Sequence, residues 1–279
     1  MFGKIFEKSR GYRNTVYELT RKQVKTQYRD STLGFLWTIL NPLLNMLVMW
    51  LVFKSVLGIT DPYYPIYLLA GNILFAALRS STMQSLESMV NNRGLLLRTK
   101  LDLEVFPLSN VLTSLVNFTF SLIALVPFMI WLTVQQGVNL FSYQLLFMFF
   151  MIPAFMLFEY GIGLFLAALY VFFRDLKHLY TVFLLLWQYL TPIFYTVNRL
   201  DQNSLAYKAI RINPMFHFVN YFRDSIYRGA SGVNMWGQET GPFIPQWSTL
   251  GIIYACGIAA FILGFVLFRM LRGKIITRI

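Results

Sequence analysis

Charged side chains are scarce in this sequence. They make up 13% of its 279 residues, whereas 57% of the residues are hydrophobic. A soluble domain of this length carries nearly twice that share of charge. Because lipid offers no partner to a bare backbone polar group, a chain this apolar is expected to span the bilayer as helices. The composition therefore excludes an ordinary soluble domain and predicts an all-α integral membrane protein.

Residues that carry chemistry are also few. Cys256 is the single cysteine, and the two histidines, His178 and His217, are isolated in the sequence. An internal disulfide is therefore excluded, and a cysteine-based metal cluster is not expected. The sequence contains no GxxxxGK[ST], HExxH, CxxC or GxSxG pattern, so it cannot bind ATP in the P-loop manner. We expect no catalytic residue, no metal site and no bound cofactor in this chain.

Residues 1–30 are too charged for a cleavable signal peptide and instead form an amphipathic pattern. At about 100° per residue, one half of the predicted helix is apolar and the other half is basic. The apolar half holds Tyr12, Val16, Tyr17, Leu19, Val24 and Tyr28, and the basic half holds Glu18, Arg21, Lys22, Lys25 and Arg29. We expect an interface helix that lies in the headgroup plane and packs on a partner. A solvated basic tail is the alternative.

Six apolar stretches follow, each close to the length of about 20 residues that an α-helical span needs. They are Leu33–Leu57, Tyr64–Leu86, Pro107–Val134, Leu140–Phe173, Leu179–Val197 and Leu250–Met270. The fourth is long enough to be tilted, kinked at Pro153 or extended beyond the membrane. The sequence therefore predicts six spans.

The distribution of positive charge predicts the topology. With the N-terminus inside, 17 of the 24 lysines and arginines fall on cytoplasmic segments. This bias places both termini in the cytoplasm. It also accounts for the net charge of +12, so a nucleic-acid partner is not expected and anionic membrane lipids are.

The cytoplasmic segment 90–105, between the second and third spans, alternates leucine with charge. Its candidate coupling residues are Arg93, Leu97, Arg98, Lys100, Leu101, Asp102 and Glu104. A short surface helix with an apolar face and both signs of charge suits docking onto another protein, although an ordinary connecting loop is the alternative. At the next cytoplasmic boundary, Arg174 and Asp175 either neutralise each other or form a solvated cap.

The segment 198–247 is the one long external segment. Its apolar residues recur at near-helical spacing, at Met215, Phe216, Phe218, Val219, Tyr221, Phe222, Ile226 and Tyr227. Asn213-Pro214 is a natural helix start, and Pro192 is expected to break the preceding span. A broken helix followed by short amphipathic helices predicts re-entrant elements, because non-helical backbone at membrane depth must be buried in protein or line a watery cavity.

Two ionisable residues, Arg79 and Glu159, fall deep within predicted spans. Charge at the bilayer centre costs about 2.5–3.5 kcal/mol on insertion scales, so such residues are functional candidates. They either pair with each other, or Arg79 faces a channel. Small residues at Gly251, Ala255 and Ala259, and at Gly161 and Gly163, are expected to allow close helix approach.

Aromatic residues gather beside the prolines of the first and fifth spans, at Trp37, Trp187, Tyr189, Phe194 and Tyr195. An aromatic face can stack on sugar C–H groups with weak adhesion, which suits a sliding polymer. Interfacial belts are the alternative.

These motifs, taken in order, resemble the membrane-spanning subunits of type-2 ATP-binding-cassette exporters, especially permeases for cell-surface polysaccharides and teichoic acids. The matching residues are Tyr28-Arg29, Ser31, Leu33-Gly34, Leu36-Trp37, Asn41-Pro42-Leu43, Arg174-Asp175, Pro192-Ile193-Phe194, Asn213-Pro214 and Tyr221-Phe222-Arg223. The resemblance covers nearly the whole chain. One departure is the stretch before Pro107, which lacks the lysine or arginine that many relatives carry nearer the proline.

The resemblance implies a homodimeric permease in a bacterial cytoplasmic membrane, with two copies of a separate ATPase subunit that bind ATP and Mg. Asn91–Glu104 would carry the coupling helix. The first and fifth spans would line the conduit, and Phe216, Tyr221 and Arg223 would belong to its outer gate. The cargo would be a lipid-linked polysaccharide or teichoic acid. The alternatives are a permease for a small hydrophobic drug or lipid, and a membrane enzyme, which would need clustered histidines or carboxylates at one membrane face.

Overall fold

The computed structural model describes residues 2–29, 32–58, 61–98, 101–137, 140–195, 201, 203–227 and 244–278. In these parts the chain is all-helical. Lys100 lies outside the described residues, as do residues 198–200, 202 and 228–243 of the predicted gate segment and residues 196–197 of the predicted fifth span.

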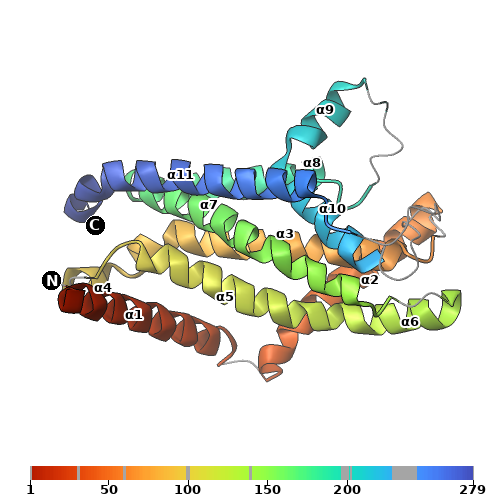
Figure 1. Ribbon diagram of the computed structural model, residues 1–279, viewed down its shortest axis with the longest axis horizontal. Coiled ribbons are helices and arrows are strands. Elements are labelled where there is room, and N and C mark those ends of the chain that lie inside the picture. The colour runs from red at the N-terminus through yellow and green to blue at the C-terminus, as the bar shows by residue number, and fades with distance from the viewer. Residues whose placement is uncertain are drawn as a thin grey trace.

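The helices form an elongated bundle, in which both termini and α4 lie at one end and α6 lies at the other (Figure 1). We call these the terminal end and the distal end. In chain order the elements are α1 (Phe2–Tyr28), η1 (Gly34–Leu36), α2 (Trp37–Leu57), α3 (Tyr64–Asn91), α4 (Arg93–Arg98), α5 (Val105–Ser121), η2 (Leu122–Leu125), α6 (Val126–Gln136), η3 (Tyr143–Met151), α7 (Ile152–Phe172), α8 (Leu176–Leu190), α9 (Leu205–Ile212), α10 (Pro214–Tyr227) and α11 (Trp247–Arg278).

Five helical segments of the described chain are long and apolar enough to cross a membrane. They are Trp37–Val56, Tyr64–Asn91, Val105–Gln136, Tyr143–Phe172 and Trp247–Arg278, and they correspond to five of the six predicted spans. The remaining one differs, because α8 ends at Leu190 after 15 residues. At 1.5 Å per residue it is about 22 Å long, short of the hydrocarbon thickness of about 30 Å. Pro192 disfavours helical backbone at Thr191, which accounts for the early end.

Pro42 lies inside α2 and does not break it. Proline has no N–H, so the carbonyl of Thr38 loses its usual helical donor. Ser121, the last residue of α5, lies where it can share its hydroxyl proton with this carbonyl, at 3.2 Å from Thr38 O and 2.9 Å from Asn117 O. The helix continues through the proline with this contact to α5.

The predicted kink at Pro153 coincides with a change of helix type. Pro153 lies in the first turn of α7, directly after the 3₁₀ segment η3. Two tyrosines donate to carbonyls of η3, Tyr221 to Phe147 at 3.0 Å and Tyr254 to Phe150 at 2.9 Å. These bonds tie η3 to α10 and α11 at a place where the regular helical pattern is interrupted.

The tightest helix pair is α7 with α11, and glycine makes it possible. A Cβ atom added to Gly161 would collide with the backbone of Ala260, and one added to Gly264 would collide with the Gly161 carbonyl. A Cβ on Gly257 would meet the Ala154 carbonyl oxygen at 2.5 Å. The absence of these side chains lets the two backbones touch, which makes the pair a closely packed unit.

The small-residue stripe predicted on α11 does not face another helix in the described part of this chain. Gly251, Ala255 and Ala259 are exposed, and a Cβ on Gly251 would meet nothing within 4 Å. The prediction for α7 is confirmed, because a Cβ on Gly163 would lie 2.9 Å from the Ser85 side chain. Spacing alone cannot tell which of several small-residue stripes faces a neighbouring helix.

Candidate functional site

The terminal end presents a short exposed helix. None of the six residues of α4 is buried, and the Leu97 side chain is 66% exposed. Leu95 is also exposed, and so are the flanking Arg93 and Arg98. Apolar side chains displayed beside cations on a solvent-accessible helix are typical of a docking surface for another protein.

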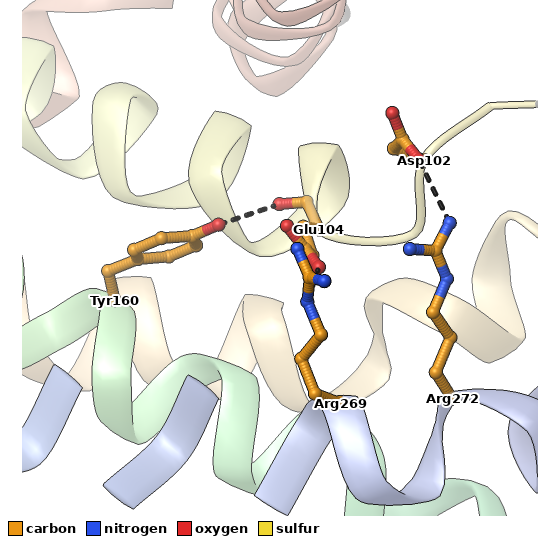
Figure 2. A network of polar contacts seen from close by, with 5 residues as sticks. All are labelled: Asp102, Glu104, Tyr160, Arg269 and Arg272. Carbon is orange, nitrogen blue, oxygen red and sulfur yellow. Dashed lines mark hydrogen bonds and ion pairs between the residues drawn. The ribbon is translucent and has the colours of Figure 1, made fainter. Parts of the chain in front are cut away.

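The three predicted coupling residues that follow α4 are held within the chain. Leu101 packs against the terminal cluster, which is formed by Met89, Leu103, Phe106, Leu164, Ala167, Ala168, Phe268 and Ile275. Asp102 pairs with Arg272 at 2.9 Å, and Glu104 pairs with Arg269 at 3.3 Å (Figure 2). The carboxylates of Asp102 and Glu104 therefore form ion pairs with arginines of α11. Sequence reasoning had placed these residues on the docking surface with Leu97.

A third ion pair at this end joins Glu87 of α3 to Lys177 in the first turn of α8. The predicted boundary residues Arg174 and Asp175 are exposed in the turn just before α8. The Asp175 carbonyl accepts from the N–H groups of His178 and Leu179, at 3.0 and 3.2 Å. Asp175 thus stands at the start of the helix, where a negative charge is favourable.

The basic face of α1 is exposed, as Arg21, Lys22, Lys25 and Arg29 all reach solvent. On the opposite side Val16 is buried and Leu19 packs against the terminal cluster. Figure 1 shows α1 running lengthwise in the bundle, where it is bonded to α5. This orientation differs from the one expected from sequence, in which the helix lay flat across the membrane surface.

A polar seam holds α1 to α5, and sequence reasoning missed it. The Gln23 side chain donates to Asn110 at 2.8 Å and accepts from Thr113 at 2.7 Å. One turn further on, Asn117 donates to Gln27 at 3.1 Å. The available signal was the helical spacing of these amides and hydroxyls along both segments, which matches one face of each helix.

Toward the distal end, the guanidinium of Arg223 on α10 lies inside the protein, with 3% of the residue exposed. It donates to the carbonyls of Pro192 at 2.7 Å, Ile193 at 3.1 Å and Tyr67 at 3.0 Å. Its central carbon lies 3.3 Å from the centre of the Tyr67 ring. Gly71 leaves the necessary space, since a Cβ there would lie 2.6 Å from Nη2. Carbonyl dipoles and an aromatic face thus stabilise the charge, while Nε has no hydrogen-bond partner among the described residues.

Tyrosines of α3 complete the same arrangement. Tyr64 donates to the Phe194 carbonyl at 2.8 Å, and the Tyr67 hydroxyl lies within 2.8 Å of the carbonyls of both Pro192 and Tyr195. Every carbonyl from residue 192 to residue 195 therefore has a donor from α3 or α10. We call Arg223, Tyr64, Tyr67 and these carbonyls the carbonyl cage. It satisfies non-helical backbone in a buried position, which a membrane protein requires.

Asn213 links the cage to the start of α10. Its side chain donates to the Thr191 hydroxyl at 2.9 Å and accepts from the Trp187 indole at 2.8 Å. The same amide oxygen accepts from the N–H of Met215 at 3.0 Å, as a helix cap does. The prediction that a helix starts at Asn213-Pro214 is confirmed.

The predicted conduit residues divide into two groups. Phe194, Phe216, Tyr221 and Arg223 are buried within the chain, whereas Trp37 and Tyr189 are exposed and Trp187 and Tyr195 are half-buried. A cavity of about 850 Å³ lies between α8 and α9, lined by Phe183, Trp187, Tyr189, Tyr195 and Ile210 among others. We call it the α8–α9 groove. It brings together three of the predicted conduit aromatics, while Trp37 lies on α2.

The two charged residues predicted deep in the membrane do not pair. Arg79 of α3 donates to the Gln188 side chain of α8 at 2.6 Å. Glu159 of α7 is buried, and one of its carboxyl oxygens has no hydrogen-bond partner among the described residues. Arg79 therefore serves as another link between α3 and α8.

Comparison with known proteins places these features in a family. Residues 14–227 match the family described as ABC-2 type transporter. The O-antigen export system permease protein RfbA of Myxococcus xanthus is 31% identical over 222 residues, 77% of this chain and 81% of the relative. RfbA of Klebsiella pneumoniae is 26% identical over 92% of this chain and 91% of its own. The polysialic acid transport protein KpsM of Escherichia coli is 22% identical over 79% and 85%. These matches confirm the resemblance seen in the motifs, and the chain belongs to the ABC-2 type transporter family.

Proposed function

We propose that this chain is the permease subunit of an ATP-driven exporter that moves a lipid-linked cell-surface polysaccharide or teichoic acid across the bacterial cytoplasmic membrane. The observation that carries the proposal is similarity over 92% of the chain to a protein named for O-antigen export. A second relative is named for polysialic acid transport. One name denotes export of O-antigen and the other transport of polysialic acid, which favours a polysaccharide as the cargo.

The proposed topology has six crossings, with α8 and the cage residues 191–195 completing the fifth. Lys177 pairs with Glu87 near one end of α3, and Pro192 accepts from Tyr67 near the other end. α8 and residues 191–195 thus run alongside most of α3, and α3 is long enough to cross a bilayer. Both termini lie at one end of the bundle, which supports an even number of passes (Figure 1). α9 and α10 would then be the re-entrant helices of an outer gate.

The terminal end would face the cytoplasm. It carries the cations of α4 and the arginines of α11, which fits the excess of positive charge on cytoplasmic segments. The exposed Leu97 on α4 would dock on a separate ATPase subunit, which would supply the ATP and Mg sites. This chain would act as the permease and would have no catalytic site of its own.

The α8–α9 groove would form part of the conduit, together with α2 and a second copy of the chain. Its aromatic lining suits both an acyl or prenyl anchor and the C–H faces of sugars. Much of the remaining surface of α8 is apolar and exposed, at Leu179, Val182, Leu185 and Leu186. A face of this kind is compatible with lipid or with the same face of a second protomer.

The same apolar groove also favours a second candidate, the export of a small hydrophobic drug or lipid. Vesicles containing this chain and its ATPase would separate the two, with undecaprenyl-linked glycan and a hydrophobic dye as parallel substrates. The proposal expects ATP-dependent movement of the glycan. Movement of the dye alone would support the second candidate and contradict the proposal.

A further inference from the structure

The structure assigns a positioning role to two arginines of α11. We propose that Arg269 and Arg272 hold the coupling helix α4 in place by clamping residues 101–104, the described segment that follows it. This inference rests on the proposed function, in which α4 meets the ATPase. No residue of α4 is fully buried and only Leu96 packs against the terminal cluster, so the position of α4 depends largely on how its two ends are attached.

Three consecutive residues of this segment contact α11. Asp102 pairs with Arg272 at 2.9 Å and Glu104 pairs with Arg269 at 3.3 Å. Leu103 lies between them, 4% exposed, and packs in the same cluster as Phe268 and Ile275 of α11. Figure 2 shows the two arginines rising from α11 toward the two carboxylates. One apolar contact flanked by two ion pairs fixes both the depth and the register of the segment.

A third helix joins the same segment. The hydroxyl of Tyr160 on α7 donates to the backbone carbonyl of Glu104 at 3.3 Å (Figure 2). Since α7 and α11 are packed backbone to backbone through Gly161 and Gly264, the clamp is mounted on the tightest helix pair of the bundle. A force applied to α4 would be passed to this pair.

The α7–α11 pair links the clamp to elements nearer the distal end. Tyr254 of α11 bonds to the Phe150 carbonyl, and α11 also contacts α10, which holds Arg223 of the carbonyl cage. A continuous path of packed elements therefore runs from the coupling helix to the outer gate.

The ion pairs are suited to opening and closing. The side chains of Asp102 and Arg272 are 34% and 36% exposed, and pairs of this exposure contribute modestly because water and salt screen them. The clamp therefore holds α4 firmly enough to set its position and weakly enough to yield when the ATPase moves.

Hydrogen–deuterium exchange on the full chain in lipid nanodiscs tests the clamp. The expected result is that Arg272→Glu and Asp102→Arg each speed exchange of the amides of residues 93–106 by about two- to five-fold, the size expected for partly exposed ion pairs. The double variant Arg272→Glu with Asp102→Arg restores the pair with its charges exchanged and returns exchange toward the wild-type rate. Lys274→Glu, an equal charge change at an exposed side chain on the same helical end, leaves it unchanged.

Unchanged exchange in Arg272→Glu, or failure of the charge exchange to restore protection, would overturn the proposal. The measurement needs neither cargo nor ATPase, so its result is independent of a failure of the proposed function. In the assembled transporter, the single variants should lower the amount of glycan exported per ATP hydrolysed, and the exchanged pair should recover it. Equal ratios in all variants would also contradict the positioning role.

Discussion

The two ends of the bundle are fixed by different chemistry. At the terminal end, partly exposed carboxylates pair with lysine and arginine across helices, as in Asp102–Arg272 and Glu87–Lys177. In the carbonyl cage, a buried arginine and two tyrosines donate to bare backbone carbonyls. Partly exposed ion pairs are weak and screened by salt, whereas unsatisfied buried carbonyls are costly. The ion pairs of the terminal end are therefore suited to movement, whereas the carbonyl cage is suited to holding the non-helical residues after α8 in place.

The cage should give the largest loss of stability when it is broken. Replacing Arg223 with leucine leaves the carbonyls of Pro192 and Ile193 without their arginine donor inside the protein. We expect the free energy of unfolding to fall by about 3 kcal/mol, because the charge-assisted hydrogen bonds to these buried carbonyls are lost and no water replaces them. Thermal unfolding of the protein in nanodiscs measures this loss. Lys208→Leu on α9, an exposed position, is the matched control, and an equal melting temperature for both variants would refute the structural role of Arg223.

A smaller loss of stability is expected when a methyl group is added next to Arg223 than when Arg223 is replaced. In Gly71→Ala the new methyl group would lie 2.6 Å from Nη2 of Arg223, so the guanidinium or α3 must shift, at a cost of about 1–3 kcal/mol. The control is Gly94→Ala in α4, where a Cβ would meet nothing within 4 Å. That change should be neutral or slightly stabilising because alanine favours helix. Similar unfolding temperatures for the two variants would contradict the tight fit at Gly71.

The polar seam of α1 should give an intermediate, local effect. Gln23→Ala removes bonds to Asn110 and Thr113, and we expect about 1 kcal/mol of lost attachment. The result would be faster proteolysis and faster amide exchange within α1, with the rest of the bundle unchanged. Lys22→Ala, the exposed neighbour, should leave both rates as they are. If the two variants behave alike, the seam does not hold α1.

The smallest effect on stability should come from the terminal ion pairs. Glu87→Gln removes the charge that faces Lys177 at the start of α8, and we expect a change in unfolding temperature below that of the variants above. High salt should produce a similar shift in the wild type and little further change in the variant, because salt screens such pairs. A loss as large as that of Arg223→Leu would remove the contrast between the two ends.

Much of the fold could be predicted from the sequence, because the signals are local. The lengths of the apolar stretches predicted five of the spans, and Asn213-Pro214 predicted the start of α10. The contacts that set the candidate site are not local. Asp102 and Arg272 are 170 residues apart, and the partners of Arg223 lie on two separate segments, α3 and residues 192–193. A single sequence shows that these side chains are polar and leaves their partners open, so Asp102 and Glu104 were assigned to docking with Leu97.

The helix α4 carries the central claim, that an ATPase drives this permease through a docking surface at the terminal end. Leu97 is exposed and Leu101 packs inward, so Leu97→Asp should leave the unfolding temperature unchanged while abolishing copurification of the ATPase subunit. Ile276→Asp, a comparably exposed apolar position near the end of α11, should retain the subunit. Copurification of the ATPase at wild-type levels with Leu97→Asp would contradict the account.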